Sequence, residues 1–363
     1  MSQAASCETN RGVLSFDSIV MSFNPQNILV VDFGQLGDVV LSLPALGALR
    51  GRFQRARISV AVGRAAAAAV ELAGVADEVL PVDRVGLRDG PKVLSLVRIG
   101  QLVREVRRRR FDLVVDLHSL SETNLLGFLS GAPRRLFARR PGRSLDYLSN
   151  FRPQPPVEDR GKHAIDRYLD VLKPLGVGDV SRVPRLPVRA EDDRAVDEIL
   201  RKMKAPLADR PAVGMFPGAG HESRRWPVER FAELAWMLER NDAVRVHLFA
   251  GPEERSLVRK ARGAFPPSTV VLDKLTVPQL AAAAARLAVF ISNDTGPMHV
   301  AAAVGTPVVI LMQHHPMFDC YVPPGERHRV VHARAITEIT PQQAYEAART
   351  ALTAERAASL FSS

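Results

Sequence analysis

The fold of this chain can be read from Asn27-Ile-Leu-Val-Val-Asp-Phe33, an apolar run that leads directly into Gly34-Gln-Leu-Gly37-Asp38 and then into a helical pattern. An apolar run, a glycine turn and a helix in this order are typical of the opening of a βαβ unit. Further strands are expected at 57–62, 79–82 and 111–117, with a helix at 91–109. Alternating strands and helices of these lengths predict a parallel, doubly wound α/β sheet.

The same pattern starts again after a proline-rich crossover. Residues 152–187 carry six prolines and one expected helix, at about 163–175. Beyond them we expect strands at 212–216, 245–250, 289–292 and 307–311, and helices at 227–240 and 341–359. Because 363 residues exceed one ordinary core, we predict two similar α/β halves. The expected divisions are a flexible leader at 1–24, a first domain at 25–187, a second at 188–335 and a terminal segment at 336–363.

Composition narrows the class of protein. Hydrophobic residues make up 46% and charged residues 24% of the chain, as in ordinary globular proteins. Two cysteines, Cys7 and Cys320, cannot build a disulfide framework or a four-ligand zinc site, so we expect a cytoplasmic protein with reduced thiols. The first 20 residues lack the order of a signal peptide. We expect their removal to change neither folding nor activity, and Met21 is an alternative start.

The net charge of +10 is unevenly distributed. Residues 25–187 hold 26 Lys and Arg against 17 Asp and Glu, whereas the remainder is nearly balanced. Such an excess favours an anionic partner, for which nucleic acid, a phosphorylated glycolipid and a membrane surface are candidates, while a compositional bias is the plain alternative. Few aromatic residues (6%) and no helix-turn-helix or zinc-finger signature argue against nucleic acid.

Four polar loops follow expected strands, where ligands of open parallel sheets bind. They are Gly34–Asp38, Pro217–Arg225, Gly251–Glu254 and Asn293–His299. Glycines allow close approach of a phosphate, and the following helix N-terminus offers free N–H groups. No G-x-G-x-x-G or G-x-x-x-x-G-K-[ST] motif is present. The sequence therefore argues against a common dinucleotide-binding site and against a P-loop nucleotide site.

Two residues in these loops each have a structural and a functional interpretation. Asp38 lies in the first turn of its expected helix, where a carboxylate is stabilised by the helix dipole; it is also placed to act as a base. Capping explains Asp294 or Thr295, but it does not explain His299. A buried core histidine and a ligand-binding histidine both remain open for that position.

Together these motifs resemble glycosyltransferase family 9, the heptosyltransferases of bacterial lipopolysaccharide assembly. The resemblance rests on Gly37-Asp38 with Leu43-Pro-Ala-Leu46, Pro217-Gly-Ala219 with Arg225-Trp-Pro227, Gly251-Pro-Glu-Glu254, and Asn293-Asp-Thr-Gly-Pro-Met-His299. It extends from about Asn27 to the final helix. The resemblance implies a GT-B fold, in which two Rossmann-like domains with parallel sheets face each other across a cleft, and a C-terminal helix that crosses back to the first domain.

The resemblance also implies a reaction. An inverting enzyme would transfer a heptose or similar sugar from an ADP-sugar to a lipopolysaccharide core or related glycan, with Asp38 as general base and neither cofactor nor metal. The donor would be bound by Gly218, Ala219, Arg224, Glu254, Asp294, Thr295, Gly296 and His299. The chain departs from the family at Gln313-His-His-Pro316, where a Gly-Pro-Thr loop near the sugar is usual, so the donor sugar is the least determined property.

Arginine clusters in the first half are candidates for the acceptor site. Arg107–Arg110 fit a solvated surface, whereas the group at 134–143 follows a strand-end loop and suits acceptor phosphates or carboxylates. The expected acceptor residues are Gly37, His118, Arg135, Arg140 and Arg143. We expect an anionic glycolipid or other glycan as partner, in the cytoplasm or at the inner face of the cytoplasmic membrane.

Two alternatives stay open at this point. One is a GT-B-fold nucleotide-sugar epimerase, which needs no acceptor; the basic first half and a base at Asp38 speak against it. The other is a non-enzymatic protein that binds anions or nucleic acid through the same basic half.

Overall fold

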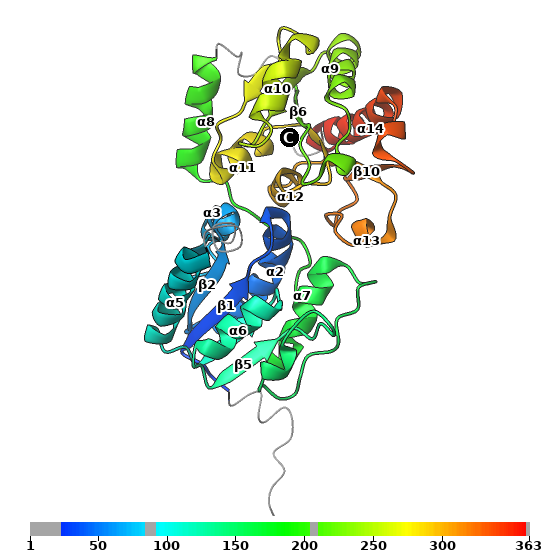
Figure 1. Cartoon of the computed structure of the whole chain (residues 1–363). Helices are drawn as coiled ribbons and strands as arrows, with labels where there is room; N and C mark the ends of the chain where they lie inside the picture. Colours follow the sequence, from blue (N-terminus) through cyan, green and yellow to red (C-terminus); the bar gives the residue numbers. More distant parts are fainter. Residues whose placement is uncertain (1–22, 84–91, 204–209, 361–363) are drawn as a thin grey trace, which may run out of the picture.

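Two α/β halves follow each other along the chain (Figure 1). The computed structural model describes residues 23–83, 92–203 and 210–360. The predicted leader therefore lies almost wholly outside the described residues. Within them, no helix is both long and apolar enough to cross a membrane.

The first half contains a five-stranded parallel sheet in the order β3-β2-β1-β4-β5. Its strands are β1 (Asn27–Asp32), β2 (Arg57–Gly63), β3 (Glu78–Val82), β4 (Leu113–Asp116) and β5 (Arg134–Phe137). Its helices are α2 (Leu36–Arg52), α3 (Arg64–Ala73), α5 (Lys92–Arg108), α6 (Ser121–Leu129) and α7 (Ala164–Leu172). Short 3-10 turns lie at η1 (Asp146–Leu148) and η2 (Lys173–Leu175).

Alternation along β1 divides the core of this half into two layers. Ile28 and Val30 pack with residues of α2, α3 and α7, whereas Leu29 and Val31 pack with residues of α5 and α6. Successive side chains of a strand point to opposite faces. A strand covered on both faces reads as a continuous apolar run, which is why the sequence at 27–33 predicts it well.

The second half repeats the plan with six parallel strands in the order β11-β10-β9-β6-β7-β8. The strands are β6 (Ala212–Phe216), β7 (Arg245–Phe249), β8 (Val270–Leu272), β9 (Val289–Asn293), β10 (Val308–Gln313) and β11 (Arg329–Ala333). The helices are α8 (Ala190–Lys202), α9 (Val228–Asp242), α10 (Arg255–Ala261), α11 (Val277–Ala285), α12 (Gly296–Ala303), α13 (Pro316–Asp319) and α14 (Pro341–Leu360). Three further 3-10 turns are η3 (Glu222–Arg224), η4 (Arg262–Ala264) and η5 (Ile336–Glu338). Two Rossmann-like sheets were predicted from the sequence and are confirmed.

The halves meet where α2 packs against α12 and α3 against α11. Val300 and Ala303 of α12 belong to the same apolar cluster as α2. A second bridge joins α7 to the segment after β10, where the Ala164 N–H donates to the Cys320 carbonyl (2.8 Å) and the Arg167 guanidinium lies over the Tyr321 ring. The region of Gln313–Pro316 thus leads into a contact between the halves.

The expectation that the C-terminal helix crosses back to the first domain is wrong for the described residues. Helix α14 packs on α9 and on strands β9, β10 and β11, and Figure 1 places it beside α9. Its buried face, which includes Ala344, Ala348 and Leu352, belongs to the core of the second half. The 3.6-residue period predicted a packed helix; it carries no information about which sheet the helix covers.

Candidate functional site

Asp38 lies in the first turn of α2, just beyond the carboxyl end of β1. Its Oδ2 accepts a hydrogen bond from the Gln35 N–H (3.0 Å), so the carboxylate does cap its own helix. Burial raises the pKa of Asp38; the Gln35 bond opposes this and the negative charge of Asp32 adds to it. A carboxylate held with a raised pKa is better matched to accepting a proton near neutrality than an exposed one.

Asp32 was not predicted as a site residue, although it ends β1 and is completely buried. Its Oδ2 accepts from the Ser42 hydroxyl (2.7 Å) and its Oδ1 from the Gly34 N–H (3.0 Å). The buried Tyr168 of α7 is close enough that the charges of Asp32 and Asp38 help burial to raise its phenol pKa well above the usual value. The sequence signal that could have identified Asp32 is a single acidic residue at the end of an otherwise apolar strand.

His118 and Arg140 extend the site along the carboxyl ends of β4 and β5. The His118 Nδ1 lies 3.9 Å from the Asp32 Oδ1. The Arg140 guanidinium donates to the His118 carbonyl and lies 3.0 Å from Glu158. Both groups act to lower the pKa of Asp38, against the larger effect of burial. The structure therefore brings the two predicted acceptor residues to the predicted base.

The three other predicted acceptor residues lie in three different surroundings. Arg135 lies at the start of β5, at the amino end of the sheet, where its guanidinium donates to the carbonyls of Leu148 and Ala132. The structure therefore does not bring it to Asp38. Gly37 is buried against the ring of His299 and serves the contact between the halves. Arg143 is exposed in the turn after β5, and its acceptor role stays a prediction.

In the second half, Asn293 holds two strand-end loops together. Its Oδ1 accepts from the Trp226 N–H (3.0 Å), and its Nδ2 donates to the carbonyls of Pro217 (3.1 Å) and Gly218 (2.9 Å). The side chain is completely buried. Sequence reasoning placed Asn293 at the head of a motif but assigned it no role.

Glu254, Gly218 and Ala219 form one corner of these loops. A Cβ on Gly218 would lie 2.5 Å from the Glu254 Cγ, so this position excludes any side chain. The Glu254 Oε2 accepts from the Gly251 N–H (3.1 Å), and burial raises the pKa of Glu254. Ala219 is buried next to Gly218. These predicted donor residues are brought together.

The Asn293–His299 motif contains the N-terminus of α12, a kind of position that suits an anion. Thr295 is the N-cap of α12, and Gly296 begins the helix, so free N–H groups and the helix dipole point out of this end. The Arg224 Nη1 lies 3.5 Å from the Asp294 Oδ2 across the neighbouring loop. Burial raises the pKa of Asp294; Arg224 opposes this, and Asp38 adds to it.

His299 is 5% exposed and neutral. Burial, assisted by the positive charge of His163, lowers its pKa to about 3. The Nδ1 has no hydrogen-bond partner among the described residues. A polar atom without a partner in this position is free to meet a ligand group.

The N-termini of α2 and α12 come together at the junction of the halves. A Cβ on Gly37 would lie 2.6 Å from the His299 Cδ2, and one on Gly296 would lie 3.1 Å from the Leu36 Cβ. The negative charge of Asp38 helps to raise the pKa of Asp294, which places the carboxylate of the first half within electrostatic range of the Arg224–Asp294 pair of the second. One side can accept a proton, and the other can stabilise a negatively charged leaving group.

Comparison with known proteins identifies this arrangement. The model of glycosyltransferase family 9 (heptosyltransferase) matches residues 99–347, more than half of the chain. The chain belongs to glycosyltransferase family 9. The predicted resemblance is thereby confirmed, and so is the prediction that the protein is a glycosyltransferase. Asp38 lies before the matched residues, whereas every predicted donor residue lies within them.

Curated relatives and solved structures that resemble this chain are also heptosyltransferases or family 9 glycosyltransferases. Lipopolysaccharide heptosyltransferase 2 of Salmonella typhimurium is 24% identical over 357 residues, covering 90% of this chain and 99% of the relative. A family 9 glycosyltransferase structure from Veillonella parvula has a TM-score of 0.78 at 27% identity, covering 92% of this chain and 99% of that one. The structure of E. coli ADP-heptose lps heptosyltransferase II has a TM-score of 0.74 at 21% identity, with 91% and 99% covered. The GT-B fold predicted from the sequence is confirmed.

Proposed function

We propose that this glycosyltransferase moves a heptose, or a similar sugar, from an ADP-sugar to a lipopolysaccharide core or related glycan. The observation that carries the proposal is the position of Asp38, a carboxylate with a raised pKa at the junction where α2 meets α12, within electrostatic range of the Arg224–Asp294 pair. The relatives named as lipopolysaccharide heptosyltransferases support the choice of sugar and acceptor.

The reaction is a direct displacement at the anomeric carbon. The acceptor oxygen forms a bond to that carbon while the bond to the donor phosphate oxygen breaks, so the configuration inverts. The hydroxyl proton passes to Asp38, and ADP leaves with the electron pair and an additional negative charge. Because the groups that stabilise this charge are already oriented, they need little reorganisation in the transition state.

The donor is bound by the second half. Arg224 and the N–H groups at the start of α12 neutralise the diphosphate, which makes a metal ion unnecessary for the chemistry. His299 offers its unpartnered Nδ1 to the sugar or phosphate. The nucleoside lies against the corner formed by Gly218, Ala219 and Glu254, where the absence of a side chain at Gly218 leaves room for the Glu254 side chain.

The acceptor is bound by the first half. Arg140 and His118 border the Asp38 carboxylate and carry positive charge or hydrogen-bond donors toward acidic groups of the acceptor. Arg143 extends the same surface from its exposed turn. Since the donor is a nucleotide sugar, we place the reaction in the cytoplasm.

Replacing Asp38 with Asn tests the proposed base. Release of ADP from ADP-heptose, with a deacylated lipopolysaccharide core as acceptor, should slow by roughly 10²–10⁴-fold. Because burial disfavours the ionised carboxylate, Asp38→Asn should melt no lower than the unsubstituted protein at pH 7. Glu229→Gln is the matched control, since Glu229 is an exposed acid in the first turn of α9. It should leave turnover unchanged.

An Asp38→Asn protein that keeps its turnover would end the assignment of the base. The donor is tested separately by melting, where ADP at about 100 times its dissociation constant stabilises the protein by about 2.7 kcal/mol. A shift with UDP and none with ADP would contradict the proposed nucleotide. Turnover should also survive EDTA, and its loss would contradict the role given to Arg224.

A further inference from the structure

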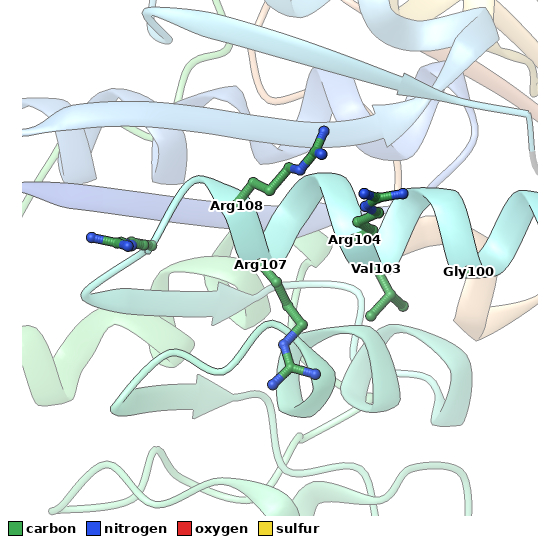
Figure 2. Close-up of a pocket in the computed structure, with 6 residues that line it drawn as sticks. Gly100, Val103, Arg104, Arg107 and Arg108 are labelled. Carbon is green, nitrogen blue, oxygen red and sulfur yellow. The ribbon is translucent and has the colours of Figure 1, made fainter.

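The outer face of α5 carries a cluster of arginines that the site described above does not use. Arg104, Arg107 and Arg108 project from the last two turns of the helix, and Arg110 follows it. With Gly100 and Val103 they line an open hollow of about 550 Å³. In Figure 2, Arg104 and Arg108 point to one side of the helix and Arg107 to the other. All four side chains are exposed.

These four arginines form no ion pair with a carboxylate of the described residues. The nearby acids are otherwise engaged: Glu105 and Glu78 both pair with Arg109, at 2.7 and 2.5 Å. Arg134, at the start of β5, is also exposed. Glu122 of α6 and Asp146 of η1 lie on the same elements, but the five exposed arginines outnumber them, so this face keeps an excess of positive charge, which favours an anionic partner.

Apolar side chains border the arginines. Of the ten large apolar side chains that are exposed among the described residues, five lie on α5, α6 and η1: Val97, Ile99, Leu125, Phe128 and Tyr147. Val97 shares one face of α5 with Arg104 and Arg108, at helical spacings of seven and eleven residues. Helices α5 and α6 pack beside each other, and η1 packs on α6.

Phe128 leaves a large apolar ring in contact with water, which is unfavourable for a surface with no partner. Its side chain and that of Leu125 are each 45% exposed, on the outer side of α6, and Tyr147 of η1 is 74% exposed. The Arg135 guanidinium lies over the Phe128 ring at 5.4 Å and is anchored by the Leu148 and Ala132 carbonyls. Arg135 thus positions an aromatic ring on this surface.

We propose that the face formed by α5, α6 and η1 docks on an anionic lipid bilayer. Arginines beside exposed aliphatic and aromatic side chains match a membrane interface, where headgroup phosphates meet acyl chains. Aliphatic side chains such as Val97 and Leu125 have no use on a nucleic acid backbone, so the lipid surface fits better. The face belongs to the half that carries Asp38, so docking would hold this half near an acceptor embedded in the membrane.

Sedimentation with lipid vesicles tests the proposal on the full-length protein. Binding should be strong to vesicles of phosphatidylcholine mixed with phosphatidylglycerol, weak to phosphatidylcholine alone, and reduced by salt. Arg104→Glu, Arg107→Glu and Arg108→Glu combined should lower binding by about 100-fold or more, since each surface arginine contributes about fivefold (about 1 kcal/mol). Leu125→Ser with Phe128→Ser should lower it by roughly tenfold at any salt concentration.

A matched control separates this face from net charge. Arg201→Glu, Arg259→Glu and Lys260→Glu change the charge equally on exposed positions of the second half, and this variant should bind vesicles nearly as well as the unsubstituted protein. Melting temperatures of both variants establish that they are folded. Equal loss in the control, no binding to anionic vesicles, or binding of duplex DNA that depends on the same arginines without vesicle binding would each overturn the proposal.

Discussion

Substituting Gly37 by alanine tests how tightly the two halves are packed. A Cβ at this position would lie 2.6 Å from the His299 Cδ2, about 1 Å closer than an ordinary carbon–carbon contact. The His299 ring is 5% exposed, so it has little room to move. The helices α2 and α12 must therefore separate, or the ring must leave its position.

Two opposing effects set the change in the free energy of unfolding that Gly37→Ala causes. Alanine is the better helix former by roughly 0.5–1 kcal/mol, whereas overpacking a dense contact costs typically 1–3 kcal/mol. We expect a net destabilisation of about 1–2 kcal/mol, which lowers the Tm of a half of this size by roughly 2–8 °C. Gly47→Ala is the control, because Gly47 lies in the same helix with nothing within 4 Å of an added Cβ. It should be neutral or stabilising.

A double-mutant cycle assigns the cost to one contact. Combining Gly37→Ala with His299→Ala removes the ring that the methyl group meets, so the penalty of the glycine substitution should disappear in that background. Thermal melting followed by circular dichroism provides all four values. If Gly37→Ala and Gly47→Ala have the same Tm, or if the penalty persists without the ring, the close contact between α2 and α12 is refuted.

Further predictions concern the polar interior of the second half. Asn293→Ala should lower the free energy of unfolding by about 2–4 kcal/mol, because it leaves the Trp226 N–H and two loop carbonyls without their partner; an unchanged urea midpoint would contradict this. Burial, with a smaller effect of Arg245, lowers the pKa of His247 to about 4, so the unfolded chain binds a proton that the folded protein does not. Stability should therefore fall as pH falls from about 6.5 toward 4, and His247→Gln should reduce this slope by up to about 1.4 kcal/mol per pH unit, which urea titrations at several pH values would measure.

Local sequence determined the elements that carry the chemistry. The apolar run before Asp38 and the run before Asn293 each specify a buried strand, and a polar loop after such a strand lies at the carboxyl edge of the sheet. For this reason the motifs alone placed Asp38 at the carboxyl edge of one sheet and Asp294 and His299 at the carboxyl edge of the other, whereas the facing of the two edges was implied only by the family resemblance. The physical basis is short-range, since a strand, a glycine turn and a helix start occupy consecutive residues.

Three of the four short edge strands gave no comparable signal, whereas β3 was predicted at 79–82. Strands β5, β8 and β11 were not predicted; each has at most five residues and lies at or next to an edge of its sheet. Arg134 and Arg135 therefore read as part of a basic loop, when they are the first residues of β5. The ends of a strand lie at opposite edges of the sheet, so Arg135 and Arg140 are close in sequence and belong to different surfaces.

What the sequence alone determined is the set of local motifs and the doubly wound class, because both depend on periods of two and 3.6 residues within one segment. Only the tertiary structure decided that α14 covers the second sheet, that Asp32 lies beside Asp38 and His118, and that Gly37 receives the ring of His299. Each of these depends on which surfaces come together over long separations in sequence. That choice is made by the burial of complementary apolar faces, and no single segment encodes it.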